Sequence, residues 1–298
     1  MAKISVVGSI NMDLVVVSET MPQKGETIIG SDFRVIPGGK GANQAVAIAR
    51  LGGDVQMFGC VGSDSFGEMA QSNLAANGVF LANVKPVAEV PTGVALINVS
   101  ENDNRIVIVL GANGHVDTAY IDSVRDALLQ NDLVLLQHEI PFETVDYTIR
   151  LCAEHGVPVM LNPAPALQVP KELIDMVSYI TPNEHEVSIV MQSNDDLDTL
   201  LARYPNKLIV TLGKDGAAYN DGEKKIMVPA IDASIMDTTG AGDTFCGAFA
   251  KAISDGAALR DAVVFGQYAS GLSIEKVGAQ AGMPTLEAIK ARMEKDRI

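Results

Sequence analysis

Residues 133–162 read LVLLQHEIPFETVDYTIRLCAEHGVPVMLN, and this stretch decides the fold class. The apolar runs at 133–137 and 157–162 predict two buried strands, and the segment 143–155 between them predicts a helix. A strand, a helix and a second strand in this order are typical of a βαβ unit, whose two strands lie parallel in one sheet.

The same alternation continues along the chain in both directions. We expect further strands at 4–7, 55–61, 179–181 and 207–212, a hairpin of 216–220 with 224–228, and helices at 43–51, 65–77, 242–254, 259–276 and 285–295. This pattern predicts an α/β fold, a doubly wound and mostly parallel sheet flanked by helices on both faces.

Short β segments at 14–17, 27–29 and 33–36, and a hairpin of 93–99 with 105–110, do not fit this alternation. They are too short to join a parallel sheet through crossover connections. We therefore expect one domain over residues 1–298, with lid strands inserted at about 14–36 and 93–110 that form a small separate sheet. Such a lid would exclude water from a site, and it offers a surface for a homodimer.

Composition excludes several classes of partner. Lys and Arg number 22 against 37 Asp and Glu, a net charge of −15 that argues against nucleic-acid and anionic-membrane binding. Asn11 and Asp13 interrupt the apolar N-terminus before a signal peptide or membrane span could form. The three cysteines form no C-x-x-C pair, so we expect neither zinc nor disulfides and place the protein in the cytoplasm. Cys246 is interpreted as a small buried apolar residue.

The stretch Asp237-Thr238-Thr239-Gly240-Ala241-Gly242-Asp243 is a glycine-rich turn that leads into a helix. Free N–H groups and the positive helix end make such a turn a site for an anion such as phosphate. The same dipole is expected to keep the Asp243 carboxylate ionised, as a base for phosphoryl transfer. Taken alone, the pattern also fits an ordinary capped helix start.

Four more polar or glycine-rich turns follow predicted strands: 8–13, 38–45, 183–186 and 211–216. Each is weak evidence by itself, but turns at strand ends are expected to converge on one edge of the sheet. Residues 38–45 lack the spacing of a Walker A loop, and residues 240–242 do not continue as a dinucleotide fingerprint, which disfavours a nicotinamide-dependent dehydrogenase.

Over essentially its whole length the chain resembles the ribokinase, or phosphofructokinase-B-type, family of carbohydrate and nucleoside kinases. Residues 38–45 (GGKGANQA) resemble the N-terminal signature of the family, residues 237–243 (DTTGAGD) its C-terminal signature, and Asn183-x-x-Glu186 its Mg²⁺/phosphate motif. Residues 8–13 (GSINMD), residues 137–139 (QHE), Lys40 and Asn43 are most similar to the members that act on ribose.

The resemblance implies a role for each matching residue. Asp243 would take the proton from the 5-hydroxyl of D-ribose as that oxygen attacks the γ-phosphate of ATP, and the N–H groups of Gly240, Ala241 and Gly242 would stabilise the developing charge. The sugar would lie beside Asp243, against Asn11, Asp13, Gly38, Gly39, Lys40, Asn43 and Glu139. ATP would lie against Asn183, Glu186, Thr211, Gly213, Lys214, Gly216, Gly242 and Gln267.

The resemblance also implies Mg²⁺ with ATP and a monovalent-cation site at Asp237, Thr239, Ser273, Lys276, Gly278 and Gly282. K⁺-binding members usually have a serine where this chain has Gly282, so K⁺ activation stays open. The acceptor also stays open between D-ribose and deoxyribose, fructose, another sugar or a nucleoside. A non-catalytic sugar or nucleotide sensor on the same fold is the remote alternative.

Overall fold

The computed structural model describes residues 2–101 and 103–296. Within these residues six strands form a wholly parallel sheet in the order β10-β9-β8-β1-β4-β5. The strands are β1 (Lys3–Val7), β4 (Asp54–Gly62), β5 (Phe80–Val87), β8 (Leu133–Leu136), β9 (Val159–Leu161) and β10 (Tyr179–Ile180). The chain runs outward from β1 in both directions, so the sheet has a crevice beyond the carboxyl ends of β1 and β8. The predicted fold class is confirmed.

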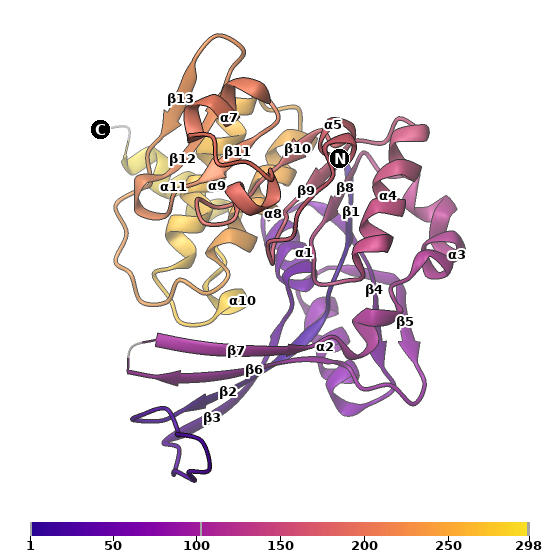
Figure 1. Cartoon of the computed structure of the whole chain (residues 1–298), viewed down its shortest axis with the longest axis vertical. Coiled ribbons are helices and arrows are strands. Elements are labelled where there is room, and N and C mark those ends of the chain that lie inside the picture. Colours follow the sequence, from indigo (N-terminus) through magenta and orange to yellow (C-terminus); the bar gives the residue numbers. More distant parts are fainter. Residues whose placement is uncertain (1, 102, 297–298) are drawn as a thin grey trace.

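Helices cover both faces of this main sheet (Figure 1). One layer contains α1 (Lys40–Arg50), α2 (Ser65–Ala76), α8 (Ala241–Ser254) and α9 (Leu259–Ser273), with α10 (Ala279–Gly282) and α11 (Leu286–Lys295) beside it. The other contains α3 (Thr118–Leu128), α4 (Phe142–Glu154), α5 (Lys171–Met176), α6 (Val187–Val190) and α7 (Leu197–Arg203).

The central strand β1 shows why the sequence is apolar without alternation. Ile4 and Val6 pack into the core under α1 and α8, whereas Val7 packs into the core under α3 and α4, and all three are fully buried. A strand covered on both faces needs apolar side chains at successive positions. This explains the continuous apolar runs that predicted the sheet.

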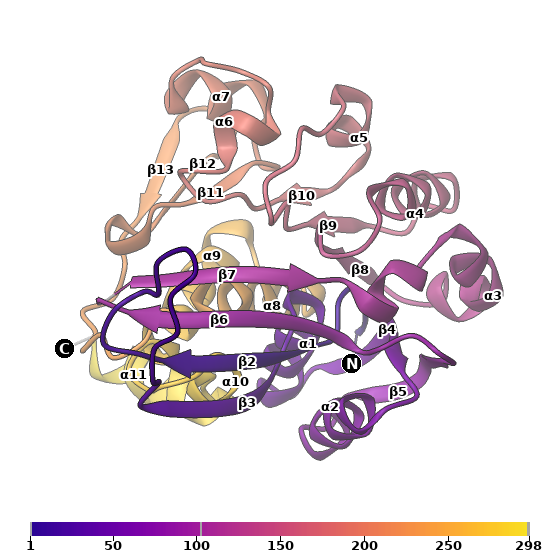
Figure 2. The ribbon, with the colours of Figure 1, turned by 60° about the horizontal axis from the view of Figure 1, so that its bottom comes forward.

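The expected small sheet is present, in the order β3-β2-β6-β7. Its strands are β2 (Asn11–Val17), β3 (Asp32–Gly38), β6 (Gly93–Ser100) and β7 (Asp103–Val109), and Figure 2 shows them side by side. The central pair β2/β6 is parallel, and the two outer pairs are antiparallel. This small sheet extends away from the helical layers at the level of α10 and α2 (Figure 1).

Residues 207–212 were expected in the parallel sheet, and this was wrong in part. Strand β11 (Ile209–Thr211) belongs to a three-stranded antiparallel sheet with β12 (Ala217–Asn220) and β13 (Lys225–Val228). Only isolated parallel bridges, Ile180 to Leu208 and Asn183 to Thr211, connect it to the end of the main sheet. The tight hairpin that follows β11 gives it an antiparallel partner.

The structure differs from the sequence-based expectation at three further places near the two sheets. Residues 27–29 form a loop without a strand, and Ile29 is 95% exposed because no neighbouring element covers it. Strand β5 was not predicted; it contains Pro86, which an edge strand tolerates because it needs fewer ladder hydrogen bonds. Asn11 and Asp13, expected in a turn after β1, lie inside β2.

Two short 3₁₀ helices, η1 (Gly111–His115) and η2 (Gly213–Asp215), complete the elements. No helix in the ranges 2–101 and 103–296 combines the length and apolar character needed to cross a membrane.

Candidate active site

The glycine turn before α8 places Asp243 at the carboxyl edge of the main sheet. Gly240 caps the helix in a left-handed conformation with φ of 76°, and a Cβ built on it would lie 2.7 Å from the Cβ of Ala279. Both conditions require glycine. Asp243 follows in the first helical turn and is 93% buried, with 7% of its surface exposed.

Two neighbouring residues of α1 hold the Asp243 carboxylate. Asn43 Nδ2 donates to Oδ2 at 2.9 Å, and Gln44 Nε2 donates to Oδ1 at 3.0 Å. Gln44 also donates to Asn162 Oδ1 at 3.0 Å, and its own Oε1 accepts from Gln137 Nε2 at 2.7 Å. Each carboxylate oxygen therefore accepts from one amide, and two further side chains orient the amide of Gln44.

Gln44, Gln137 and Asn162 were given no individual role from the sequence. Gln44 and Gln137 stood inside quoted motifs, and both are fully buried. A wholly buried amide needs a polar partner, but the sequence did not show that Gln44 would face the Asp243 carboxylate or that Gln137 would donate to Gln44.

The helix dipole was expected to keep the Asp243 carboxylate ionised, but the pKa of this group is raised above its ordinary value. Burial raises its pKa, and the Lys40 ammonium and the amides of Asn43 and Gln44 oppose that rise without cancelling it. Desolvation penalises the charged form more than these neighbours favour it. Lys40 in turn has a raised pKa: burial lowers it, but the carboxylates of Asp243 and Glu139 outweigh burial.

Residues assigned to the sugar gather beside Asp243. Glu139 Oε2 accepts from Ser9 Oγ at 2.6 Å and from the Lys40 backbone N–H at 3.0 Å, which anchors the start of α1 to the loop after β8. Asn11 Oδ1 accepts from Asn113 Nδ2 at 2.6 Å. The side chains of Asn11 and Glu139 are thereby fixed before any ligand binds.

Asp13 lies opposite the di-glycine turn. A Cβ at Gly38 would lie 2.4 Å from Asp13 Oδ2, and one at Gly39, where φ is 90°, would lie 2.7 Å from the Asn11 backbone nitrogen. Burial and the nearby carboxylates of Glu139 and Asp243 raise the pKa of Asp13 to about 7. No hydrogen bond to another described residue satisfies this carboxyl group, in contrast to Glu139.

Two adjoining cavities lie on either side of the glycine turn. The smaller, of about 200 Å³, is lined by Lys40, Asn162, Ala164, Thr181, Asn183, Glu186, Thr211, Gly240, Gly242, Asp243 and Cys246. The larger, of about 700 Å³, shares Asn183, Thr211 and Gly242 with it and adds Gly213, Lys214, Gly216 and Gln267. All residues expected to contact ATP therefore line one or both of these connected spaces.

Asn183 and Glu186 form a reciprocal cap before α6. Asn183 Oδ1 accepts from the Glu186 N–H, and Glu186 Oε2 accepts from the Asn183 N–H, both at 2.9 Å. This is a capping-box arrangement, and both residues still line the smaller cavity. The two reciprocal hydrogen bonds thus fix the side chains of Asn183 and Glu186 at the wall of the smaller cavity.

The N–H groups of the glycine turn are not equivalent. Ala241 N–H donates to Thr238 O at 3.2 Å, whereas those of Gly240 and Gly242 donate to no other described residue. A Cβ at Gly242 would meet nothing within 4 Å, so an anion could approach its backbone closely. The geometry fits a phosphate oxygen at Gly240 and Gly242 better than at Ala241.

The wall of the larger cavity is mainly apolar and includes Ile231, Ile235, Phe245 and Ile274. Gln267 of α9 also lines it and is only 5% exposed. Apolar side chains together with one buried amide suit a nucleobase.

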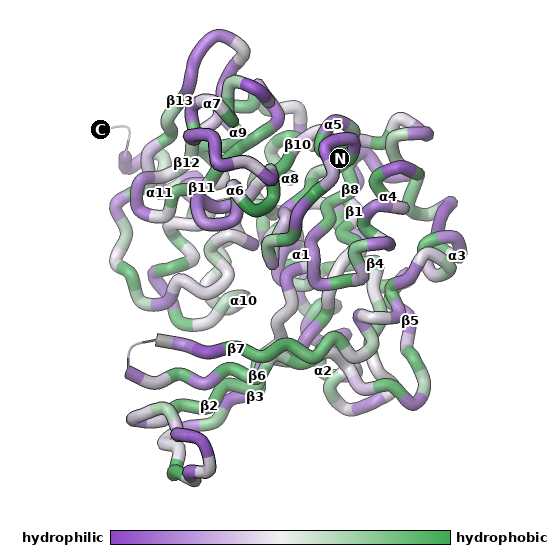
Figure 3. Tube along the Cα trace, in the orientation of Figure 1, coloured by the Kyte–Doolittle hydropathy of each residue, from purple (hydrophilic) through white to green (hydrophobic). Residues whose placement is uncertain are grey.

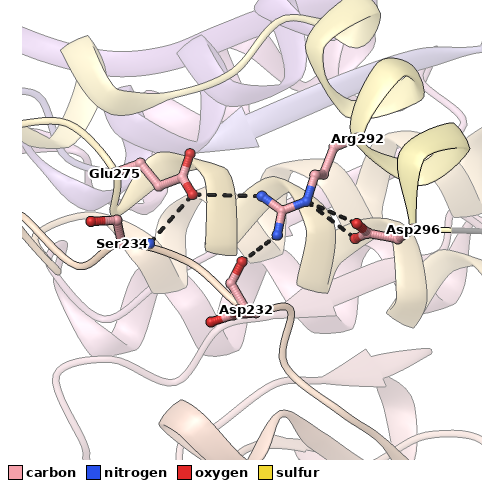
Figure 4. Close-up of polar contacts among 5 residues, drawn as sticks. All are labelled: Asp232, Ser234, Glu275, Arg292 and Asp296. Carbon is pink, nitrogen blue, oxygen red and sulfur yellow. Dashed lines mark hydrogen bonds and ion pairs between the residues drawn. The ribbon is translucent and has the colours of Figure 1, made fainter.

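Arg292 of α11 contacts the backbone of Asp232, a residue that lines this cavity. Figure 4 shows Arg292 and its polar partners. Its guanidinium donates to the Asp232 carbonyl oxygen, pairs with Glu275 at 3.6 Å, and donates to Asp296 at 3.1 Å. Glu275 Oε1 also accepts from the Ser234 N–H at 3.4 Å. These contacts fix the segment that contains Ile231 and Ile235.

The expected monovalent-cation site has few free side-chain oxygens. Asp237 accepts from the N–H groups of Thr239 at 2.9 Å and Gly278 at 2.8 Å, and Ser273 Oγ donates to Ser270 O at 2.7 Å. A Cβ at Gly282 would lie 2.3 Å from the Ser273 carbonyl oxygen, so a serine there would require the loop to move. The groups left for a cation are mostly backbone carbonyls. The described residues contain no cluster of three or more His, Cys, Asp or Glu side chains suited to a metal.

Cys246 lines the smaller cavity, but its thiol is 2% exposed and lies 3.4 Å from Thr181 Oγ1. Burial raises its pKa to about 12. The thiol is therefore protonated and unreactive at neutral pH.

Comparison with known proteins agrees with this geometry. The profile of the pfkB family carbohydrate kinases matches residues 1–286. The ribokinase of Lactococcus lactis subsp. lactis is 47% identical over 299 residues, covering 100% of this chain and 99% of its own. The crystal structure of ribokinase from Thermotoga maritima, 35% identical, has a TM-score of 0.90 and covers 99% of this chain and 100% of its own. That of Arabidopsis thaliana ribokinase complexed with ribose and ATP, 32% identical, has a TM-score of 0.87, with 97% and 98% covered.

Proposed function

Since the chain belongs to the pfkB family of carbohydrate kinases, we propose that it transfers the γ-phosphate of ATP to the 5-hydroxyl of D-ribose. The observation that carries the proposal is the position of Asp243. Its carboxylate lies where the sugar-side residues and the smaller cavity meet, and that cavity opens toward the nucleotide-sized one.

In the proposed reaction Asp243 accepts the proton of the attacking hydroxyl. Asn43 and Gln44 orient its two oxygens, and Lys40 supplies the positive charge that favours the ionised form. The N–H groups of Gly240 and Gly242 stabilise the charge that builds up on the transferred phosphoryl group. The sugar hydroxyls bind Asn11, Asp13, Lys40 and Glu139.

Mg²⁺ with the ATP phosphates is part of the proposal. The smaller cavity offers the carboxylate of Glu186, an oxygen ligand of the type that Mg²⁺ prefers, whereas Asn183 Oδ1 already accepts from the N–H groups of His185 and Glu186. A bound Mg²⁺ would neutralise phosphate charge in a chain whose net charge is −15. K⁺ activation is the weaker part, since Asp237 and Ser273 already have protein partners.

We also propose a cytoplasmic homodimer that associates through the small sheet. By strand register Val16 of β2, Phe33 of β3, Leu96 of β6 and Val107 of β7 lie on one face of this sheet, and they are between 37% and 61% exposed. Figure 3 shows hydrophobic positions along these strands. An exposed apolar sheet face of this kind is typical of an interaction surface. Three buried free cysteines suit a reducing compartment.

The test is an ADP-coupled assay with Mg-ATP against D-ribose, 2-deoxyribose, fructose and adenosine, each with and without K⁺. D-ribose should give the highest kcat/KM. If Asp13 binds vicinal hydroxyls, 2-deoxyribose should be markedly poorer, because a buried carboxylate loses a partner. Turnover confined to another acceptor would keep the mechanism and reassign the sugar pocket. ATP binding without turnover of any acceptor would favour the sensor.

A further inference from the structure

The amide groups that reach Asp243 from α1 continue into a chain of three side chains. Asn73 Nδ2 donates to Gln280 Oε1 at 2.6 Å, Gln280 Nε2 donates to Asn43 Oδ1 at 2.9 Å, and Asn43 Nδ2 donates to Asp243 Oδ2 at 2.9 Å. We call Asn73, Gln280 and Asn43 the amide relay. All three donate in the same direction, toward the carboxylate.

The two relay residues nearest Asp243, Gln280 and Asn43, lie in the protein interior. Gln280 is 4% exposed and Asn43 is 6% exposed, so water does not satisfy a group that loses its partner. An amide has a donor end and an acceptor end, and reversing one reverses what its neighbour must present. If Asn43 turned over, its Oδ1 would face the Asp243 carboxylate, and two acceptors would oppose each other.

The backbone around Gln280 is anchored from two sides. Arg50 Nη1, at the end of α1, donates to the carbonyl oxygens of Gln280 at 2.5 Å and Met283 at 3.1 Å. On the other side Gly278 N–H donates to Asp237 Oδ2 at 2.8 Å. Ala279 of this loop packs against Gly240, and the next residue, Gln280, donates to Asn43. One loop therefore contacts both the glycine turn and the relay.

We propose that Gln280 is a positioning residue for phosphoryl transfer, because its amide determines which end of Asn43 faces the Asp243 carboxylate. This inference rests on the proposed role of Asp243 as the base. Gln280 touches neither the sugar nor ATP in this assignment, and it acts through Asn43.

Other charges around Asp243 are independent of the relay. Lys40 of α1 lowers the pKa of Asp243 and Glu139, after β8, raises it, while Asp13 of β2 and Cys246 of α8 are coupled to its charge. Glu186, before α6, faces Lys40 and Cys246. These groups remain in place when Gln280 changes, so an effect on kcat can be assigned to the orientation of Asn43.

The experiment compares Gln280→Glu with Gln280→Met under saturating Mg-ATP and D-ribose. At pH 8 the introduced carboxylate has no donor, attracts Asn43 Nδ2 and reverses that amide, so kcat should fall by about 10- to 100-fold. Methionine matches the shape and forces neither orientation, so its kcat should fall less, by about 3- to 10-fold. The KM for ATP should stay within about twofold in both.

The pH dependence separates orientation from packing. Lowering the pH protonates the introduced carboxyl group and restores a donor to Asn43, so the ratio of Gln280→Glu to wild-type kcat should rise on acidification. A merely structural role predicts a ratio that does not change with pH, and that result would overturn the inference. Gln71→Glu, on α2 and outside the site, controls for the added charge.

Two further variants keep the outcome interpretable. Asn73→Asp removes the N–H donor to Gln280 Oε1 and should also lower kcat, but by less than Gln280→Glu does. This variant tests the relay if the Gln280 variants fail to fold. Asp243→Asn tests the premise: retained turnover there would remove the proposed base itself. Loss of turnover in Asp243→Asn together with wild-type kcat in Gln280→Glu and Asn73→Asp would overturn the relay alone.

Discussion

The residues proposed to bind the sugar and the larger cavity, proposed to bind ATP, differ in how their polar groups are held; we call them the sugar side and the nucleotide cavity. On the sugar side Asn11, Asn43, Glu139 and Asp243 are each at least 93% buried, and each is bonded to another side chain or to backbone. The nucleotide cavity is walled largely by apolar residues and glycine turns, and Ile235 is 67% exposed at its edge.

The difference indicates where selectivity lies. Fixed, desolvated polar groups discriminate strongly between ligands, because a ligand that lacks a hydroxyl leaves them unpaired. An open apolar cavity mainly recognises shape and tolerates small changes. We therefore expect substitutions on the sugar side to have larger effects than substitutions around the nucleotide cavity.

The largest expected effect is that of Asp243→Asn. The substitution keeps the size of the side chain but removes the proton acceptor, so kcat should fall by about 10²- to 10⁴-fold. Binding of ATP, measured by calorimetry, should change little. Wild-type turnover would contradict the assignment of this carboxylate as the base.

Asp13→Asn tests the sugar side without touching the base. If the Asp13 carboxylate accepts hydroxyl groups of the sugar, as proposed, its replacement should raise the KM for D-ribose by about 10- to 100-fold. It should also narrow the difference between ribose and 2-deoxyribose. An unchanged ratio of kcat/KM between these two sugars would show that Asp13 does not read the 2-hydroxyl.

Arg292→Ala tests the nucleotide cavity from outside it. Loss of the contacts to Asp232 and Glu275 should loosen the segment with Ile231 and Ile235 and raise the KM for ATP by about 3- to 10-fold. The KM for ribose should remain within about twofold. Arg260→Ala, on an exposed surface of α9, is the matched control for removal of a positive charge. A rise in the KM for ribose as large as that for ATP would show that the two sides are not independent.

The smallest expected effect is on stability. The pKa of Asp13 is raised to about 7 in the folded state from an ordinary value of 3.8, so the folded state retains its proton longer than the unfolded state. The stability that this difference in pKa gives the folded state is complete below about pH 4 and is lost as the pH rises through 7. In the ligand-free protein Asp13→Asn should therefore raise Tm by a few degrees at pH 8 relative to wild type, and by less at pH 5. A Tm difference that does not vary with pH would contradict this.

The sequence predicted the main sheet well because its strands are covered on both faces and are largely apolar, as the wholly buried β8 (LVLL) shows. It also predicted the small sheet, whose segments were too short for crossovers. It failed at β5, for which no strand was predicted, and at 27–29, where a β-like composition found no partner.

The site was predictable in its parts but not in its connections. The motifs contained Asn43, Lys40, Glu139 and Asp243, and the structure gathers them. The amide relay was not visible, because Gln280 lies more than 200 positions from both Asn43 and Asn73 and meets them only through tertiary packing. The raised pKa of Asp243 was missed for the same reason, since burial depends on neighbours distant in the chain.

The placement of Asn11 and Asp13 inside β2 bears on how such an enzyme changes its substrate over evolution. These two side chains, proposed to bind the sugar, belong to the small sheet, whereas Asp243 and the walls of the larger cavity belong to the α-helical layers and the turns at the edge of the main sheet. Mutations in the small sheet can therefore alter part of the proposed sugar site while the groups proposed for the transfer chemistry are inherited unchanged.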